Sequence, residues 1–371
     1  MAEVLSFKTV SNRLPDNIIW KFLSYNQRHV EWAGFSLHDI IQPSFTMLVG
    51  VVLPYSIAGR IQSGESVLTI LIHTLKRSFI LICLGIFLRS TNSAQTNFTF
   101  EDTLTQIGLG YTFLVLISFT NYHIQVGILI SILLMYGLLF ALYPLPGTDF
   151  NYSLVGMEPN WAFNYKGFWA HWNKNTNVAW AFDTWFLNLF PRESTFLFNR
   201  GGYTTLNFIP TLGTMILGLF AGHILKNTKP KNKKLRQLII LGLTLCLSGL
   251  IAHILGINPI VKRIWTPAWV LFSGGLCYWF LAFFYYIIDV SDKGWTLFVL
   301  KVIGINSIAA YIIADAGIKV WISKSLYIHL GSNYDQIVGP AYTTLISGAL
   351  VLLFEWLILY WMFKKKIFLK I

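Results

Sequence analysis

The sequence predicts an all-α fold, a polytopic transmembrane helix bundle. Of its 371 residues, 55% are hydrophobic and only 12% are charged, about half the charged fraction of an ordinary soluble domain. The hydrophobic residues gather in blocks of about 20, the length that an α-helix needs to cross a bilayer. Lysine and arginine gather beside two such blocks, at 226–236 and 364–370, as in cytoplasmic loops. The net charge of +12 therefore indicates membrane orientation and needs no nucleic acid.

Nine apolar blocks are predicted to span the membrane: 40–58, 67–89, 102–120, 122–144, 206–226, 235–256, 264–288, 295–321 and 341–363. The basic loop after the fifth block and the basic tail after the ninth are both assigned to the cytoplasm, and the four spans between them make these assignments agree. Counting back places 145–205 outside as a long periplasmic loop region. We expect one transmembrane domain over 1–371 that contains this region.

An odd number of spans leaves the first residues on the outer side. Either the N-terminus is translocated, or another helix precedes it. The abrupt start Met-Ala-Glu-Val-Leu favours a further N-terminal helix, which would give ten spans.

Ionisable residues cluster where the first span begins, at 28–39. Such groups are costly at the edge of a membrane and usually have a function. Gly34 permits a bend that would fold His29 back over Asp39, and an acid beside a histidine fixes the tautomer of the ring. We predict His29 as a catalytic base and Asp39 as its orienting acid. The alternative is a water-exposed interfacial histidine, and His38 is a second, weaker candidate.

The same span carries polar and small residues at steps of three and four, namely Asp39, Gln42, Thr46 and Gly50. This spacing puts them on one face of a helix. Because lipid would penalise a polar stripe, we expect it to point into the bundle.

The outer region 145–205 is rich in tryptophan and asparagine. Aromatic faces and amide groups are what sugar rings need, for stacking and for hydrogen bonds to hydroxyls. The alternative for the tryptophans is an aromatic belt at the membrane interface. Within the segment AHWNKNTN we predict substrate-binding residues, namely His171, Trp172, Asn173, Asn175 and Asn177.

Further polar residues within or beside the spans are candidates for binding a donor molecule. Two basic pairs would suit an anion such as a phosphate, although Lys76 could snorkel to an interface and Arg77 could form a buried pair. A stripe of Ser307, Tyr311 and Asp315 and a glutamine beside small residues could instead make structural bonds between helices. The predicted donor-binding residues are Lys76, Arg77, Gln106, Lys262, Arg263, Asn306 and Ser307.

Most familiar catalytic motifs are absent from the sequence: it has no Walker loop, no G-x-S-x-G elbow, no H-E-x-x-H and no C-x-x-C. The three cysteines, Cys83, Cys246 and Cys277, lie inside apolar blocks and predict neither a disulfide framework nor a metal site. Base-assisted group transfer by a histidine is the chemistry that remains.

The run HVEWAGFSLHDIIQPSF resembles the catalytic segment of the heparan-alpha-glucosaminide N-acetyltransferase family, in which a histidine precedes Trp-x-Gly, an acid and a proline-containing helix. Segments 76–82, 211–223, 262–267 and 304–308 fit the same family in collinear order. No single motif is specific, but the set is. The resemblance is to a bacterial, membrane-embedded acyltransferase branch of the family.

The resemblance implies transfer of an acetyl group from acetyl-CoA to the amino group of a sugar on the outer side of the membrane, without a metal. By position, His29 matches the active-site histidine of the family, Asp39 the acid after it and Asn306 the asparagine of an Asn-Ser-Ile motif. A bacterial inner membrane with His29 on its periplasmic side, an amino-sugar acceptor and a homodimer are the expected location and partners. Direct transfer and an acetyl-histidine intermediate are both open.

Two other classes of function fit the residues. A transporter for a sugar or an anionic solute would use the same polar stripes as a pathway, but it would move intact solute and break no thioester. A structural scaffold would not need so many charges at membrane depth.

Overall fold

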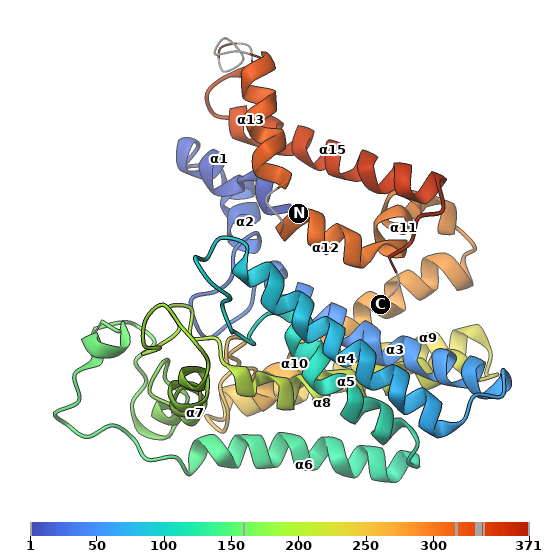
Figure 1. Ribbon diagram of the computed structural model, residues 1–371, viewed down its shortest axis with the longest axis horizontal. Coiled ribbons are helices and arrows are strands. Elements are labelled where there is room, and N and C mark those ends of the chain that lie inside the picture. The colour runs from blue at the N-terminus through green and yellow to red at the C-terminus, as the bar shows by residue number, and fades with distance from the viewer. Residues whose placement is uncertain (1, 159, 316–317, 331–335, 337, 370–371) are drawn as a thin grey trace. The chain divides into compact units, whose positions relative to one another are not determined.

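The computed structural model describes residues 2–158, 160–315, 318–330, 336 and 338–369 (Figure 1). Within these residues the regular elements are helices, and the one β-bridge joins Ala33 to Val261 outside any strand. Seven helices are long and apolar enough to cross a membrane, or eight if one bent pair counts as a span. The predicted all-α, polytopic membrane fold is therefore confirmed.

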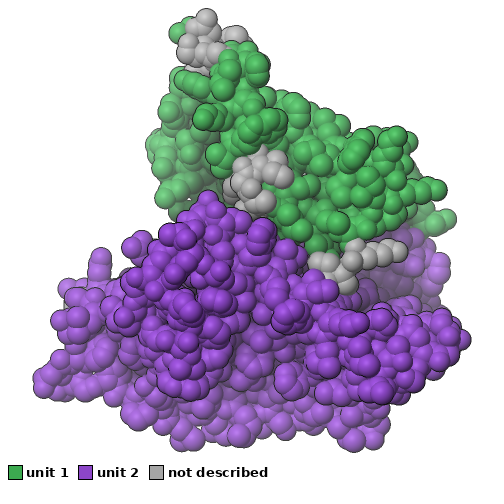
Figure 2. All heavy atoms as spheres, viewed as in Figure 1, with its two compact units in different colours: residues 1–29, 36–39, 292–371 green, residues 30–35, 40–291 purple. Residues whose placement is uncertain are grey.

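The chain forms two compact units (Figure 2). Unit 1 comprises Met1–His29, Ser36–Asp39 and Asp292–Ile371, and unit 2 comprises Val30–Phe35 and Ile40–Ser291. The segment 28–39, on which the predicted catalytic residues lie, therefore contributes to both units. The single domain over 1–371 stays a prediction.

Unit 2 holds most of the long helices and the short helix α7. They are α3 (Ile41–Gln62), α4 (Val67–Ser90), α5 (Thr103–Ser118), α6 (Tyr122–Ala141), α7 (Val178–Phe186), α8 (Phe208–Lys226), α9 (Lys231–Ile254) and α10 (Pro267–Tyr285), which a π-helical turn extends over Tyr286–Val290. Side-chain oxygens of polar residues start several of them. Asp102 accepts the backbone N–H groups of Leu104 and Thr105, and Asn121 accepts that of Ile124.

Helix α8 lies at the centre of unit 2, and α3 packs tightly against it. A Cβ atom added at Gly50 would collide with the α8 backbone at Met215, and one added at Gly218 would collide with the α3 backbone at Met47. Small residues bring helices this close inside membranes, where no water drives them together. Thr46 and Gly50 are buried, as the polar stripe on this span predicted.

The predicted outer region 145–205 folds into short elements that share a buried core with neighbouring segments of unit 2. These elements are η3 (Tyr152–Val155), η4 (Gly167–Trp172), α7, η5 (Leu187–Leu189) and η6 (Thr205–Asn207). Trp172 is buried in a cluster with Trp32, Phe140 and Val261. This packing fixes the loop region against the ends of the long helices of unit 2.

The described residues of unit 1 form several short helices and one long helix. They are η1 (Ala2–Leu5), α1 (Phe7–Arg13), α2 (Ile18–Asn26), η8 (Gly294–Leu297), α11 (Phe298–Ile305), α12 (Ser307–Asp315), α13 (Ile318–Leu330) and α15 (Thr343–Lys364), together with residues 37–39 of the turn η2 (Leu37–Ile40). Val302, Ala310 and Leu359 are buried in its core. Gly348 of α15 lies against the backbone of Val4, so η1 packs directly on α15.

Each of the nine predicted spans coincides with helix in the described residues, but two of them are not single membrane-length helices. The block 102–120 forms α5, which has 16 residues between its Asp102 cap and Phe119. The block 295–321 is bent by 67° between Gly294–Ile305 and Ser307–Ala314. The break falls at Asn306, whose non-helical backbone ends α11. The count of nine spans is therefore not confirmed.

Candidate active site

The strongest candidate site is the pair formed by His29 and Asp39 in unit 1. Nδ1 of His29 lies 2.7 Å from Oδ1 of Asp39, the contact that the bend at Gly34 predicted. Gly34 has a φ of 119°, in the region that suits glycine and few other residues. The Asp39 side chain is 1% exposed and that of His29 is 36% exposed. The carboxylate is thus enclosed, whereas the ring is accessible.

The surroundings of Asp39 fix its orientation. Its Oδ2 atom accepts hydrogen bonds from the backbone N–H of Ser36 (3.1 Å) and from the Ser36 hydroxyl (2.9 Å). With Oδ2 held in this way, Oδ1 accepts from Nδ1–H of His29. In the neutral ring this places the basic lone pair on Nε2. The arrangement is that of a base whose tautomer is set by a buried acid.

The second histidine of the segment lies beside the first. The rings of His29 and His38 have centroids 4.4 Å apart. Nε2 of His38 lies 2.8 Å from a carboxylate oxygen of Glu3 in η1. His38 therefore packs on the predicted base and is itself tied to the N-terminal turn.

In the outer segment, the predicted substrate-binding amides are buried and bonded to backbone. Asn173 makes two bonds of 2.9 Å with the backbone N–H and carbonyl of Tyr165. The Asn175 amide donates to the carbonyls of Val155 and Asn199. Asn177 caps α7 by accepting the N–H groups of Ala179 and Trp180.

The two remaining residues predicted to bind substrate are also held by the fold. Trp172 is buried in the core of the outer region. Nδ1 of half-buried His171 lies 2.9 Å from the carbonyl oxygen of Tyr143, so this nitrogen is the donor. Direct contact of these five side chains with a substrate stays a prediction.

The two residues of the basic pair on α4 lie in different environments. Lys76 is exposed, whereas Arg77 is half-buried and its Nη1 donates to the Tyr111 hydroxyl at 3.2 Å. Nε of Arg77 is buried and has no hydrogen-bond partner among the described residues. A ligand with a hydrogen-bond acceptor could satisfy this N–H group of Arg77.

The second basic pair lies between α9 and α10. Lys262 is buried, and Arg263 is half-buried. The Arg263 guanidinium donates to the carbonyls of Gly201 and Val30, the latter being the residue that follows His29 in sequence. Arg263 therefore holds together three segments of unit 2 that are far apart in the chain.

The polar residues predicted within the spans have different environments. The Gln106 amide donates to the carbonyls of Phe100 and Thr205, and its Oε1 is buried without a partner in the described part of the chain. The Asn306 amide is bonded to the backbone of the C-terminal tail. Ser307 begins α12 and is half-buried. The side chain of Asp315, the third member of that stripe, lies outside the described residues.

One residue that the sequence patterns missed is Lys174. It is half-buried between the structural amides, and its ammonium lies 5.5 Å from the centre of the Trp161 ring. Burial lowers the pKa of Lys174, the charge of Arg263 lowers it further, and Glu31 raises it. The sequence signal that could have identified Lys174 is its position as the single basic residue within the run Asn-Lys-Asn-Thr-Asn.

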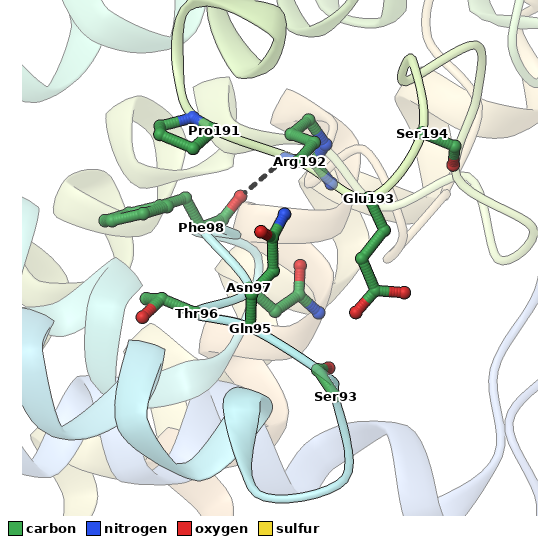
Figure 3. Close-up of a pocket in the computed structure, with 9 residues that line it drawn as sticks. All are labelled: Ser93, Gln95, Thr96, Asn97, Phe98, Pro191, Arg192, Glu193 and Ser194. Atoms are coloured by element: carbon green, nitrogen blue, oxygen red, sulfur yellow. Dashed lines mark hydrogen bonds between the residues drawn. The ribbon is translucent and has the colours of Figure 1, made fainter.

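A polar hollow of about 180 Å³ opens elsewhere in unit 2, between residues 93–98 and 191–194 (Figure 3). Nη1 of Arg192 donates to the Phe98 carbonyl at 2.8 Å, and Glu193 accepts the backbone N–H of Ala94. None of the predicted site residues lines this hollow. The side chains of Arg192 and Glu193 bond to the backbone of the 93–98 loop, so the hollow lies where two loops are joined.

The thiols and acids do not form a metal centre in the described part of the chain. Among those residues no three histidine, cysteine, aspartate or glutamate side chains gather closely enough to hold a metal ion. Cys83 is exposed, and Cys246 and Cys277 are buried thiols.

The fold and this site define a class: a polytopic α-helical membrane protein with a carboxylate-oriented imidazole. No family model matches the chain. The chain is 24% identical to heparan-alpha-glucosaminide N-acetyltransferase of Homo sapiens, over 93% of the chain and 56% of that protein. It is 22% identical to the protein of that name from Mus musculus, over 77% and 48%. The chain is thus a distant relative of these proteins, and it spans about half the length of the curated relatives it matches.

Proposed function

We propose that the chain transfers an acetyl group from acetyl-CoA to the amino group of a sugar at the extracytoplasmic face of a membrane. The observation that carries the proposal is the 2.7 Å contact between a buried carboxylate and an accessible imidazole, His29. The similarity to two proteins named as N-acetyltransferases supports the reaction type. A bacterial inner membrane, with His29 periplasmic, is part of the same proposal.

His29 acts as the general base. An amine attacks a thioester only through its lone pair, so the ammonium form must first lose a proton. As the nitrogen bonds to the acetyl carbon, Nε2 of His29 takes a second proton from the amine. The tetrahedral intermediate then expels the CoA thiolate, which is protonated by the imidazolium. The products are the N-acetylated sugar and CoA, and His29 is restored to its neutral form.

Asp39 stabilises the imidazolium that forms during this step. Its carboxylate is fixed by Ser36 and accepts the Nδ1 proton of His29. A two-step route, in which His29 first carries the acetyl group and then passes it to the amine, uses the same two residues. In both routes Nε2 is the reacting atom.

The donor is assigned to the polar residues on α4, α5 and the α9–α10 loop. Arg77 and Gln106 each present a buried polar atom without a partner in the described residues, one a donor and one an acceptor. Such atoms suit a molecule that bears both amides and phosphates, as acetyl-CoA does. We assign the remaining predicted contacts to Lys76, Lys262, Arg263, Asn306 and Ser307.

The acceptor is assigned to the outer region, with residues 171–177 as its binding segment. The packed aromatic residues of this region, Trp161 and Trp172 among them, provide a rigid floor. The amide side chains shape the backbone of the segment, so it can present its neighbouring groups to a sugar.

The test is transfer of label by the full chain reconstituted in vesicles. Acetyl-CoA labelled in the acetyl group is supplied on the side of the 226–236 loop, and glucosamine on the other side. Wild-type protein should produce labelled N-acetylglucosamine. His29→Ala should reduce the rate about a thousandfold, the scale of general-base catalysis, while keeping CoA binding and the thermal unfolding temperature. His123→Ala, which removes an exposed histidine at the start of α6, is the matched control.

Two results would contradict the proposal. Full transfer by His29→Ala would remove this residue from the chemistry. Movement of intact glucosamine or acetyl-CoA across the vesicle membrane, without cleavage of the thioester, would make the chain a transporter.

A further inference from the structure

Two cationic side chains of unit 2 flank one glycine turn. A Cβ atom added at Gly201 would lie 3.0 Å from Nη1 of Arg263, and one added at Gly202 would lie 2.9 Å from Cγ of Lys174. Because these glycines are consecutive, Lys174 and Arg263 are brought together although 89 residues separate them in sequence (263 − 174). The absence of side chains at the turn leaves room for both cations.

The guanidinium of Arg263 is fixed in place but keeps binding capacity. It donates to the carbonyl oxygen of Gly201 (2.7 Å) and to that of Val30 (3.1 Å from Nη2 and 3.4 Å from Nε). A guanidinium carries five N–H donors, so these three bonds leave two. No carboxylate of the described residues lies within ion-pair distance of Arg263.

The ammonium of Lys174, near the guanidinium of Arg263, makes fewer hydrogen bonds than the guanidinium does. In the described part of the chain it has no hydrogen-bond acceptor, and its contact is the face of the Trp161 ring at 5.5 Å. Glu31 is the acid whose charge it senses, and the Glu31 carboxylate accepts the indole N–H of Trp161. Arg263 lies over a second ring, that of Tyr203, at 5.2 Å.

Holding two half-buried cations together is unfavourable. Burial removes water from the ammonium, and the charge of Arg263 adds to its instability, which is why the pKa of Lys174 is lowered. A bound anion would offset both the loss of water and the repulsion between the two cations. It would neutralise their charge and accept hydrogen bonds from their unused N–H groups. Charged groups kept at such a cost commonly mark a functional site.

We propose that Lys174 and Arg263 form a binding site for an anionic group, a carboxylate, sulfate or phosphate, with Trp161 and Tyr203 as aromatic walls. Identifying the anion as part of a substrate depends on the proposed function, but anion binding itself does not. The group belongs either to an acidic amino-sugar acceptor or to the phosphates of the donor. In both cases Lys174 supplies a charge-assisted hydrogen bond and Arg263 a second one.

The first experiment measures anion binding without any reaction. The full chain in lipid nanodiscs is titrated with radiolabelled sulfate. Wild-type protein should bind sulfate saturably, and Lys174→Met should weaken binding at least tenfold, since one charge-assisted bond is lost. Lys174→Arg should restore it. Lys166→Met, which removes an exposed lysine of the same region, is the matched control. Unchanged sulfate binding in Lys174→Met, or equal loss in Lys166→Met, would overturn the proposal.

The second experiment distinguishes the two sources of the anion. If the acceptor carries it, Lys174→Met should raise the KM of glucosamine 6-sulfate about tenfold more than the KM of glucosamine, and leave the Kd of CoA unchanged. If the donor carries it, the Kd of CoA should rise about tenfold and both acceptors should be affected alike. Either pattern supports the site. Wild-type chain that binds sulfate but transfers no acetyl group would refute the proposed function and leave the anion site standing.

Discussion

Segments 28–39 and 171–177 are both dense in polar side chains, and the structure uses them in opposite ways. In the first, an enclosed carboxylate orients a histidine ring that is 36% exposed. In the second, the amides of Asn173, Asn175 and Asn177 are buried and bonded mainly to backbone groups. The first segment leaves the imidazole ring partly exposed. In the second segment the amides bond the backbone of an irregular loop.

The difference shows how polar residues are distributed in a mostly apolar chain. A loop of turns and short helices has many backbone N–H and C=O groups without helical partners, and buried ones must be bonded. Short amide side chains satisfy them. Longer side chains, such as the imidazole of His29 and the ammonium of Lys174, extend past the backbone, and we propose binding roles for both.

Asp39→Asn should have the largest effect of the substitutions that test this contrast. The Ser36 N–H and hydroxyl groups would retain the carbonyl oxygen of the new side-chain amide, so its NH₂ group would face Nδ1 of His29. Nδ1 would then have to accept, which moves the ring proton to Nε2 and removes the base. We expect kcat to fall about 10²-fold or more, measured with labelled acetyl-CoA.

The control for this change is Asp16→Asn, which alters an exposed carboxylate in unit 1. It should leave kcat unchanged. If Asp39→Asn keeps full activity at an unchanged unfolding temperature, the carboxylate is structural and the contrast between the two segments disappears.

Asp183→Asn tests whether a buried acid of the 145–205 region contributes to stability. Asp183 accepts the backbone N–H of Thr205, yet burial raises its pKa from 3.8 to about 7. Between these two values the folded chain holds a proton that the unfolded chain releases. The stability that this proton provides is full below about pH 4 and is lost as the pH rises to 7.

Relative to wild type, Asp183→Asn should therefore gain roughly 2–3 kcal/mol of unfolding free energy between pH 5 and pH 8. Thermal or denaturant unfolding at the two pH values measures this difference. Asp149→Asn, an exposed acid of the same region, should show no such change. A pH-independent difference between Asp183→Asn and wild type would mean that Asp183 is ionised in the folded chain.

Asn177→Ala should have the smallest of these effects. It removes the cap of α7, formed by two N–H groups at 3.0 Å from Oδ1, and a bond to the Asn173 carbonyl. We expect a loss of about 1–2 kcal/mol of stability and a small rise of the acceptor KM in the folded fraction, because the amide shapes the binding segment. A large rise of that KM, without loss of stability, would instead make Asn177 a direct substrate contact.

Much of the fold could be predicted because it follows from local patterns. In the described residues the apolar blocks predicted the position of every membrane-length helix, since length and hydrophobicity decide what can cross a bilayer. The His29–Asp39 contact was predicted because a single glycine and a ten-residue separation bring the two residues together. Where a helix is interrupted within an apolar block, as at Asn306, hydrophobicity carries no signal of the break.

The candidate anion site could not be predicted because it depends on tertiary contacts. Lys174, Gly202 and Arg263 are distant in sequence and meet through the packing of the outer region against the α9–α10 loop. The bonds of Asn173 to Tyr165 and of Asn175 to Val155 and Asn199 likewise depend on packing, and contact of these side chains with a sugar stays a prediction.

The anchoring of the C-terminal tail by Asn306 has a practical consequence. The amide of this residue donates to the Ile367 carbonyl and accepts the Leu369 N–H, within unit 1. A purification tag fused behind the tail would therefore pull on the bend between α11 and α12. Insertion of the tag into the exposed turn at 227–230 would spare that bend.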